Sequence, residues 1–285
     1  MKLILSRKGF DSSAGGVPSP IFPDGRMVTL PIPDAASTIR YRDIAHDGAS
    51  LGDLVGQLTR GKVTPEDGAH LDPDLISDML PRMPGWRPLF GQAGQAQGHL
   101  RNQGVGPGDL FLFFGLFRRV EPHDGAWRWA PDSRPCHVVW GWLQVGSVVA
   151  VDEARSGDFA WAAYHPHFRR GADPGNVLYL AARRLGLPGL GETLPGAGVF
   201  PRFAAERQLT APHAANTSTW RLPAWCYPEA GRRPLTYHAN RQRWRKRDAH
   251  AELTAAARGQ EFVLDGDDYP QALPWAGDLI RNLDR

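Results

Sequence analysis

Two long apolar segments constrain the fold of this chain most strongly. Residues 108–117 read GDLFLFFGLF, and residues 137–151 read HVVWGWLQVGSVVAV. Both are rich in β-branched and aromatic residues, which favours neighbouring strands inside a buried sheet. The polar, proline-containing residues 118–136 between them predict a long hairpin excursion. Regular alternation would place four side chains of the second segment on one face: Val138, Trp140, Trp142 and Gln144.

The composition adds many turns to this buried sheet. The chain has 285 residues, of which 32 are glycine and 25 are proline, and so high a content favours loops over long helices. Hydrophobic residues make up 42%, enough for a large core. We therefore expect a mixed α/β protein in which residues 1–285 form one compact domain. It should have a central, mostly β core, short helices and many Gly/Pro-rich loops.

Polar side chains directly follow the first expected strand, residues 2–6. Arg7 and Lys8 are suited to hold phosphate oxygens. Asp11 is suited to bind a metal ion or act as a base, and Ser12 to orient a substrate oxygen. The alternative is a simple turn in which Asp11 caps its own backbone. Because a turn has no use for all four side chains, we predict that this loop is catalytic.

A candidate metal site lies in the short run HLDPD, residues 70–74. Imidazoles suit transition metals, and carboxylates suit Mg²⁺ or Mn²⁺. His70 and Asp72, together with Asp11 of the opening loop, are the predicted ligands of a divalent ion, Mg²⁺ or Mn²⁺. The alternative is that Asp72 caps a helix that begins at Pro73.

A pair of histidines flanks Pro166. In an extended segment, His165 and His167 would project from the same side, as a pair of metal ligands does. Two histidines on the surface are the commoner arrangement, so the motif is interpreted in that way first.

A pocket is predicted from two further segments. Residues 88–104 suit a helix on which Gln92 and His99 share one arc, as a solvated face or as the wall of a pocket. Trp140 and Gln144, on one face of the second long strand, would suit a pocket that holds an extruded base between aromatic walls.

Positive charge is concentrated in the last third of the chain. Residues 221–247 contain eight Lys and Arg residues against Glu229 alone, a local charge of +7. Lys and Arg neutralise phosphates, and aromatic side chains between them can stack on unpaired bases. The alternative is a solubilising surface. We call residues 220–247 the basic-aromatic segment, and its predicted nucleic-acid contacts are Trp220, Arg221, Tyr237, Arg241, Arg243, Trp244 and Arg245.

Other motifs are missing from the sequence. It has no HExxH, GxSxG, Walker A or GxGxxG motif, so we expect no nicotinamide, flavin or ATP site. Cys136 and Cys226 lie far apart, which fits a reducing compartment. Because no stretch suits a signal peptide or a membrane span, we expect a cytoplasmic protein without a membrane partner.

Several motifs in order carry a resemblance to a known family: SRKGFDSSAGGVPSPI, FGQAGQAQGHL, GDLFLFFGLF, HVVWGWLQVG, TWRLPAWCYP and LTYHANRQRW. From residue 2 to about residue 280, the chain resembles the nucleotide modification-associated domain 3 family of bacteria and phages. The resemblance implies a link to DNA base modification or to conflict between phage and host, without a defined reaction. The polar positions shared with the family correspond to Arg7, Lys8, Asp11, Ser12, Gln92, His99, His137, Gln144, Trp220, Tyr237 and His238.

These observations predict a metal-assisted enzyme that acts on nucleic acid, DNA rather than RNA. It would cleave a phosphodiester or modify a base, with His238 moving a proton and His137 lining the pocket. Two alternatives remain open at this point. One is a non-catalytic reader of modified bases, and the other is an enzyme that modifies free nucleotides.

Overall fold

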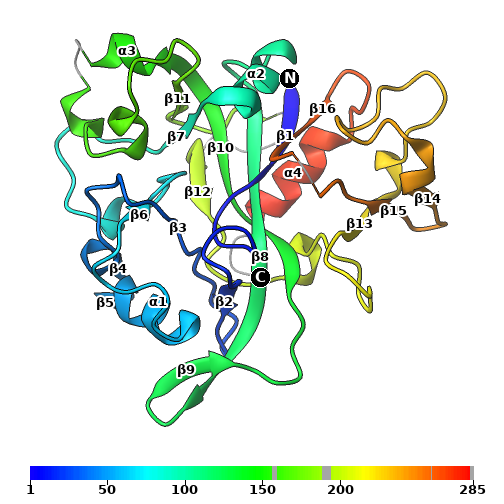
Figure 1. Cartoon of the computed structure of the whole chain (residues 1–285). Helices are drawn as coiled ribbons and strands as arrows, with labels where there is room; N and C mark the ends of the chain where they lie inside the picture. Colours follow the sequence, from blue (N-terminus) through cyan, green and yellow to red (C-terminus); the bar gives the residue numbers. More distant parts are fainter. Residues whose placement is uncertain (156–158, 188–193, 258, 283–285) are drawn as a thin grey trace.

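A large mixed β-sheet organises the protein (Figure 1). The computed structural model describes residues 1–155, 159–187, 194–257 and 259–282. The strands of the main path lie in the order β16-β1-β8-β10-β11-β7, while β2 and β9 pair with β8, and β12 pairs with β10. Their bounds are Lys2–Arg7 (β1), Ser19–Ile21 (β2), Leu89–Gln92 (β7), Leu110–His123 (β8), Ala126–Trp129 (β9), Cys136–Ala150 (β10), Val177–Ala181 (β11), Ala197–Val199 (β12) and Glu261–Asp265 (β16).

The two apolar segments form the longest strands, β8 and β10, which pair antiparallel as neighbours. The predicted excursion between them is itself largely strand, because β8 continues to His123 and pairs with β9. The expected regular alternation in β10 is broken at Trp140. Val139 pairs with Phe114 and Gly141 with Phe113, so Trp140 is the extra residue of a β-bulge.

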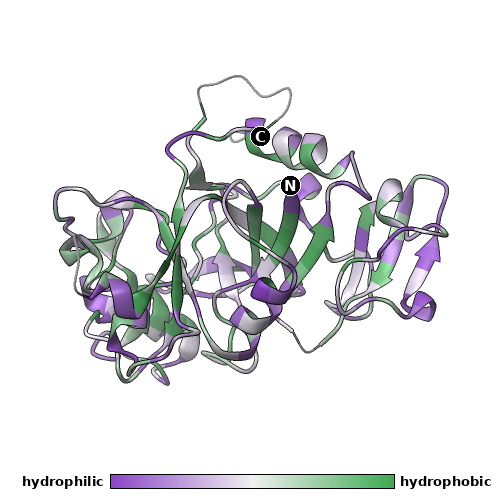
Figure 2. Ribbon diagram, turned by 90° about the horizontal axis from the view of Figure 1, so that it is seen from above, coloured by the Kyte–Doolittle hydropathy of each residue, from purple (hydrophilic) through white to green (hydrophobic). Residues whose placement is uncertain are grey.

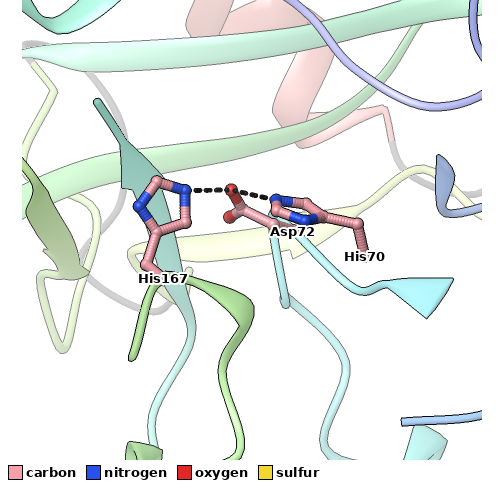
Figure 3. A group of neighbouring side chains, drawn as sticks. All are labelled: His70, Asp72 and His167. Atoms are coloured by element: carbon pink, nitrogen blue, oxygen red, sulfur yellow. Dashed lines mark ion pairs between the residues drawn. The ribbon is translucent and has the colours of Figure 1, made fainter. Parts of the chain in front are cut away.

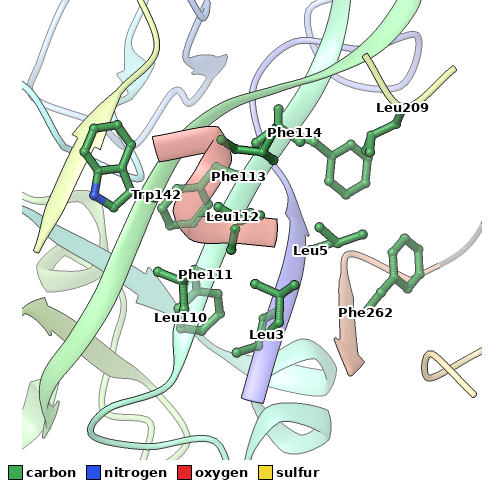
Figure 4. Close-up of a cluster of buried hydrophobic side chains, with 14 of the residues drawn as sticks. Leu3, Leu5, Leu110, Phe111, Leu112, Phe113, Phe114, Trp142, Leu209 and Phe262 are labelled. Atoms are coloured by element: carbon green, nitrogen blue, oxygen red, sulfur yellow. The ribbon is translucent and has the colours of Figure 1, made fainter. Parts of the chain in front are cut away.

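Strand β1 lies inside the sheet, parallel to β8 and antiparallel to β16. Its apolar side chains therefore pack in the main hydrophobic core. Figure 4 shows Leu3 and Leu5 of β1 among leucine and phenylalanine side chains of β8, with Phe262 of β16 nearby. This central position fixes where the polar residues after β1 emerge.

An N-terminal lobe, residues 28–80, has a hydrophobic cluster of its own. It contains two small sheets and one α-helix, which is capped by Ser50, since the Ser50 hydroxyl accepts a hydrogen bond from the N–H of Gly52. The helix expected at Pro73 is absent, because the next helical residues form only a 3-10 turn at Ser77–Met79. The elements are Ile32–Pro33 (β3) with Ala69–His70 (β6), Ala45–His46 (β4) with Ala49–Ser50 (β5), and Leu51–Thr59 (α1).

The remaining elements surround the main sheet. In Figure 1 a small three-stranded sheet lies on the opposite side of the long strands from the N-terminal lobe. Hydrophobic residues follow the central strands, and hydrophilic residues gather in the outer loops (Figure 2). The elements are Gly94–Asn102 (α2), Val151–Ala154 (α3), Thr219–Pro223 (β13), Trp244–Lys246 (β14), His250–Thr254 (β15) and Ala272–Arg281 (α4).

The helices are few and short, as expected for this mixed α/β fold. The helix predicted over residues 88–104 is shorter than expected, because residues 89–92 form strand β7 and pair with β11. Short 3-10 helices lie at Tyr41–Asp43, Ser77–Met79, Ala160–Ala162, Pro166–Arg169, Ala205–Arg207, Ala224–Cys226 and Arg241–Arg243. Among the helices of the described residues, none has the length and apolar character that crossing a membrane requires.

Candidate metal centre

A cavity of about 230 Å³ lies beside the end of β1, and we call it the polar cavity. Its walls come from the opening loop, from β6 and β7, and from the 3-10 helix Pro166–Arg169. Six residues that the sequence singled out line it: Arg7, Lys8, Asp11, His70, Asp72 and Gln92. His167 and Arg170 also line it. Parts of the chain that are distant in sequence therefore converge here.

Asp72 is the centre of this group, with only 5% of its side chain exposed. Its Oδ1 accepts a hydrogen bond of 2.8 Å from the N–H of Gly91 and lies 3.4 Å from Nε2 of His165. Its Oδ2 lies 3.4 Å from Nε2 of His167 and 3.7 Å from Nε2 of His70. Figure 3 shows the carboxylate between the two imidazole rings.

The other ring nitrogens of these two histidines are held by acceptors. Nδ1 of His70 donates to Oδ2 of Asp34 at 2.8 Å, and Nδ1 of His167 donates to Oδ1 of Asn176 at 2.5 Å. The amide of Asn176 is oriented by its Nδ2, which donates to the carbonyl of His167. A neutral ring with its proton on Nδ1 presents the lone pair of Nε2 toward Asp72, whereas a charged ring donates from Nε2 to this carboxylate. Metal-binding histidines are oriented by the same kind of partner.

Three acceptor atoms that face one another need a positive charge between them. One ligand atom from each of His70, Asp72 and His167 lies within 4.8 Å of the other two. Burial lowers the pKa of His70, but its hydrogen bonds and charge interactions with Asp72 and Asp34 outweigh this and raise the pKa overall. The charge is then supplied either by protons on the rings or by a metal ion.

Asp72 is ionised in this setting. Burial alone would raise the pKa of its carboxyl group, but the neighbouring imidazoles of His165, His167 and His70 hold the pKa well below its usual range. A buried carboxylate with two imidazole Nε2 atoms beside one oxygen is a set of donors that fits a divalent transition metal.

Two glycines make room for this arrangement. A Cβ at position 91 would collide with the imidazole ring of His167, so only glycine lets β7 pass that close. Gly9 has a φ of +93°, and a Cβ there would lie 2.6 Å from Cγ2 of Thr29. Both positions therefore require glycine for the cavity to keep its shape.

The two cations at the end of β1, Arg7 in the strand and Lys8 after it, already have partners. The guanidinium of Arg7 donates to the carbonyls of Ala256 and Ala257, and burial lowers its pKa against the opposing charge of Asp11. Nζ of Lys8 lies 2.8 Å from Oε1 of Glu261, a carboxylate that is almost fully buried. The same oxygen accepts a 2.6 Å hydrogen bond from the amide of Gln92. The charge of Lys8 is therefore largely neutralised, while Gln92 is held at the cavity wall.

The carboxylate of Asp11 in the opening loop accepts hydrogen bonds from its own turn. Oδ1 of Asp11 accepts from the N–H groups of Ser13 and Ala14 and from the hydroxyl of Ser13. The turn that we considered as the alternative is thus formed, yet Asp11 also lines the polar cavity. Ser12 is exposed and is not one of the lining residues.

His238, predicted to move a proton, lies elsewhere. Its ring is buried against Phe262, and its Nε2 accepts a hydrogen bond from the N–H of Ala256. Nδ1 donates to the carbonyl of Thr236, and burial lowers the pKa of the ring to about 4. It does not line the polar cavity, and both of its nitrogens hold the backbone in place.

Three other residues predicted for the pocket hold neighbouring segments. Nδ1 of His137 accepts from the indole of Trp220, and burial lowers its pKa to about 4. The amide of Gln144 donates to the carbonyls of Gly108 and Gly186. Nε2 of His99 lies 3.0 Å from the hydroxyl of Thr236. Trp140 lines a different cavity, next to the polar one.

The basic-aromatic segment is arranged differently. Trp220 is fully buried, and Trp244, 5% exposed, donates its indole N–H to the carbonyl of His238. These two rings are therefore part of the core. Tyr237 is 50% exposed. The arginine side chains lie at the surface, where those of Arg241 and Arg243 donate to backbone carbonyls and Arg221 and Arg245 flank Glu252 across the small sheet.

The sequence interpretation missed part of the centre. His165 and His167 were interpreted as surface residues, but both are buried and face Asp72. The signal was their spacing around Pro166, which begins a 3-10 helix. Asp34 and Asn176, which orient the rings, carry no local pattern that could have revealed them.

Comparisons with known proteins give one finding. A family model described as nucleotide modification associated domain 3 matches residues 2–265. No curated protein and no solved structure matches the chain.

Proposed function

Since the chain belongs to the nucleotide modification associated domain 3 family and has a role connected with nucleotide modification, we propose that it is a metal-dependent enzyme that acts on a nucleotide unit of DNA. The observation that carries the proposal is the group at the polar cavity. His70 and His167 turn their Nε2 atoms to the buried carboxylate of Asp72, while Asp34 and Asn176 hold the opposite nitrogens.

The proposed ion is a divalent transition metal such as Mn²⁺, Fe²⁺ or Zn²⁺. Two imidazoles and one carboxylate suit these ions better than Mg²⁺, which prefers oxygen ligands. The ligand set changes from the predicted one, because His167 takes the place of Asp11. Such an ion, held by these three side chains, would supply Lewis-acid chemistry at the polar cavity.

The other side chains of the polar cavity would bind and orient the substrate. Arg170 and Arg7 are the cations proposed to hold a phosphate, since Lys8 is paired with Glu261. Lys8 would act as a positioning residue that, through Glu261, holds the amide of Gln92 at the wall. Since Asp11 and His70 share the same cavity, the loop and the metal centre would contact one substrate.

DNA outside the cavity is proposed to contact the exposed cations of the basic-aromatic segment. Arg221 and Arg245 lie on the two strands that flank β15, and Arg241, Arg243 and Tyr237 lie at the surface of the same segment. Their charge would bind phosphates without reading sequence. The proposal also includes a cytoplasmic location for the protein and a part in conflict between phage and host.

The first experiment measures metal binding. The protein is stripped of metal, and the affinities for Mn²⁺ and Zn²⁺ are determined by calorimetry for wild type, for Asp72→Asn and for Asp124→Asn. Asp72→Asn keeps the size of the side chain but removes the charge, so binding of one ion per chain should be lost. Asp124, a carboxylate with 89% of its side chain exposed, supplies the matched control. Equal affinity in wild type and Asp72→Asn would contradict the proposed centre.

The second experiment measures the reaction. DNA is incubated with the metal-loaded protein, and its strands and nucleosides are analysed by mass spectrometry for cleavage and for altered bases. A product that depends on Asp72 and on the metal supports the enzyme. Metal-dependent binding of DNA without any product would instead support a reader of modified bases.

A further inference from the structure

We propose that a second cavity beside the metal centre holds the base of the same nucleotide. This inference rests on the proposed function and names the substrate class. The cavity has a volume of about 460 Å³, and we call it the apolar cavity. It shares Gly9 and Asp72 with the polar cavity. Asp72 thus stands in the wall between the two spaces.

The walls of the apolar cavity are suited to a flat, weakly polar group. Apolar side chains from the N-terminal lobe and from the segment after β12 line it: Met27, Val28, Leu71, Leu75, Met79 and Phe200. Its volume lies within the range of roughly 300–1,000 Å³ that small-molecule sites occupy. Six polar or charged side chains also line it: Arg26, Thr29, His46, Asp47, Asp72 and Asp78, with Arg26 ion-paired to Asp47.

Trp140 lines this cavity and carries a buried hydrogen-bond donor without a partner among the described residues. The side chain lies at the bulge of β10 and is only 6% exposed, and its ring stacks on Phe113 with centroids 5.7 Å apart. Its buried Nε1 has no hydrogen-bond partner among the described residues. Since a buried donor without a partner is unfavourable, a ligand that brings an acceptor would satisfy it. Ring nitrogens and carbonyl oxygens of bases are acceptors, whereas an acyl chain would leave the indole unpaired.

The two cavities together match the two halves of a nucleotide. A nucleotide joins a flat aromatic base to an anionic phosphate through one sugar. The apolar cavity provides aromatic and aliphatic walls, and the polar cavity provides Arg7 and Arg170. Because Asp72 borders both, a base in the apolar cavity would lie next to the proposed metal. This arrangement favours modification of the base over cleavage of the strand.

Such a ligand has two sources, a free nucleotide or a base extruded from a DNA strand. The first test concerns the deoxynucleotide unit that both sources share. Calorimetry in the presence of Mn²⁺ compares the four 2′-deoxynucleoside 5′-monophosphates with 2-deoxyribose 5-phosphate, which lacks the base. In wild type, at least one deoxynucleotide should bind about tenfold tighter or more, as expected for a stacked and hydrogen-bonded base.

Two variants test the cavity itself. Val199→Phe narrows it from β12 at a residue that is not a proposed metal ligand, so the deoxynucleotide should lose its advantage while the affinities for Mn²⁺ and 2-deoxyribose 5-phosphate stay unchanged. Trp140→Phe keeps an aromatic ring but removes the donor, and the advantage should fall several-fold. Trp275→Phe, a tryptophan outside both cavities, is the matched control.

The outcomes separate this inference from the proposed function. If Mn²⁺ and 2-deoxyribose 5-phosphate bind but the base adds nothing, or if its advantage survives Val199→Phe, the base site is refuted and the metal centre stands. If neither Mn²⁺ nor any phosphate binds, the proposed function itself fails. Single-stranded DNA with one abasic position then identifies the source. A loss of affinity relative to intact DNA supports an extruded base, and equal affinity supports a free nucleotide.

Discussion

The polar cavity and the basic-aromatic segment use their charged side chains in opposite ways. In the cavity, His70, Asp72 and His167 come from different parts of the chain and turn their polar atoms toward one another. In the segment, neighbouring cations are neutralised one by one at the surface, as in the pairs Lys246 with Glu229 and Arg247 with Glu252. Exposed pairs of this kind add little to stability.

The aromatic side chains differ in the same way. Trp140 lines a cavity, and its indole N–H has no partner among the described residues. Trp220 and Trp244 are buried, and their indoles donate to Nδ1 of His137 and to the carbonyl of His238. Many charged and aromatic residues close together in the sequence therefore do not by themselves form a binding site. Convergence of unpaired groups from distant parts of the chain is the stronger indication.

The largest effect should come from Trp220→Ala. The ring is fully buried, packs against Phe114 and Phe262, and donates to His137. Its removal should lower the free energy of unfolding by about 3–5 kcal/mol, which urea denaturation measures. Trp220→Phe should have a smaller effect. If Trp220→Ala weakens DNA binding but leaves stability intact, the contrast between the two regions is wrong.

A smaller effect, on the affinity for metal, is expected from Asp34→Ala, which changes a partner of His70. The carboxylate holds Nδ1 of His70 and does not itself face the ion. Loss of such an outer partner should reduce the affinity for Mn²⁺ or Zn²⁺ by about 10- to 100-fold, measured by calorimetry. Asp124→Ala is the control. An unchanged affinity would show that metal binding does not depend on the hydrogen bond from His70 to Asp34.

Acid should destabilise the protein through two buried histidines, one of them in the basic-aromatic segment. Burial lowers the pKa of His137 and of His238 from 6.5 to about 4. Between these values the unfolded chain binds more protons, so stability is complete above about pH 6.5 and falls toward pH 4. Each group contributes at most about 1.4 kcal/mol per pH unit. His238→Gln should flatten this slope in urea denaturation at several pH values, and an identical slope would argue against its burial.

The smallest effect on the fold should come from replacing Arg241, Arg243 and Arg245 together by glutamine. Because Arg241 and Arg245 are exposed and Arg243 is only half-buried, the free energy of unfolding should hardly change. Affinity for DNA should fall, and the dependence of log K on log salt should flatten by about one unit for each phosphate that the protein no longer neutralises. An unchanged salt dependence would show that these cations only face solvent.

The sequence predicted the central strands of the sheet better than the candidate metal centre. Apolar patterns of residues 108–117 and 137–151 identify the central strands because burial on both faces leaves a strong local signal. The proximity of Asp11, His70 and Asp72 was also predicted. The position of His167 beside Asp72 was not predicted, because local spacing says nothing about which distant carboxylate a histidine faces. The bulge at Trp140 likewise depends on pairing with β8, which no pattern within β10 reveals.

The parallel pairing of β1 with β8 has a consequence for how the molecule opens. Between these adjacent strands the chain makes a long excursion, residues 8–109, that includes the N-terminal lobe with its separate hydrophobic cluster. Such a unit can unfold locally while the main sheet remains intact. His70 and Asp72 belong to the lobe, and His167 lies beyond β10. An ion bound by all three would stabilise the contact between the lobe and the rest of the protein. Because local unfolding of the lobe would then be rarer, amide hydrogen exchange in α1 would slow as metal is added.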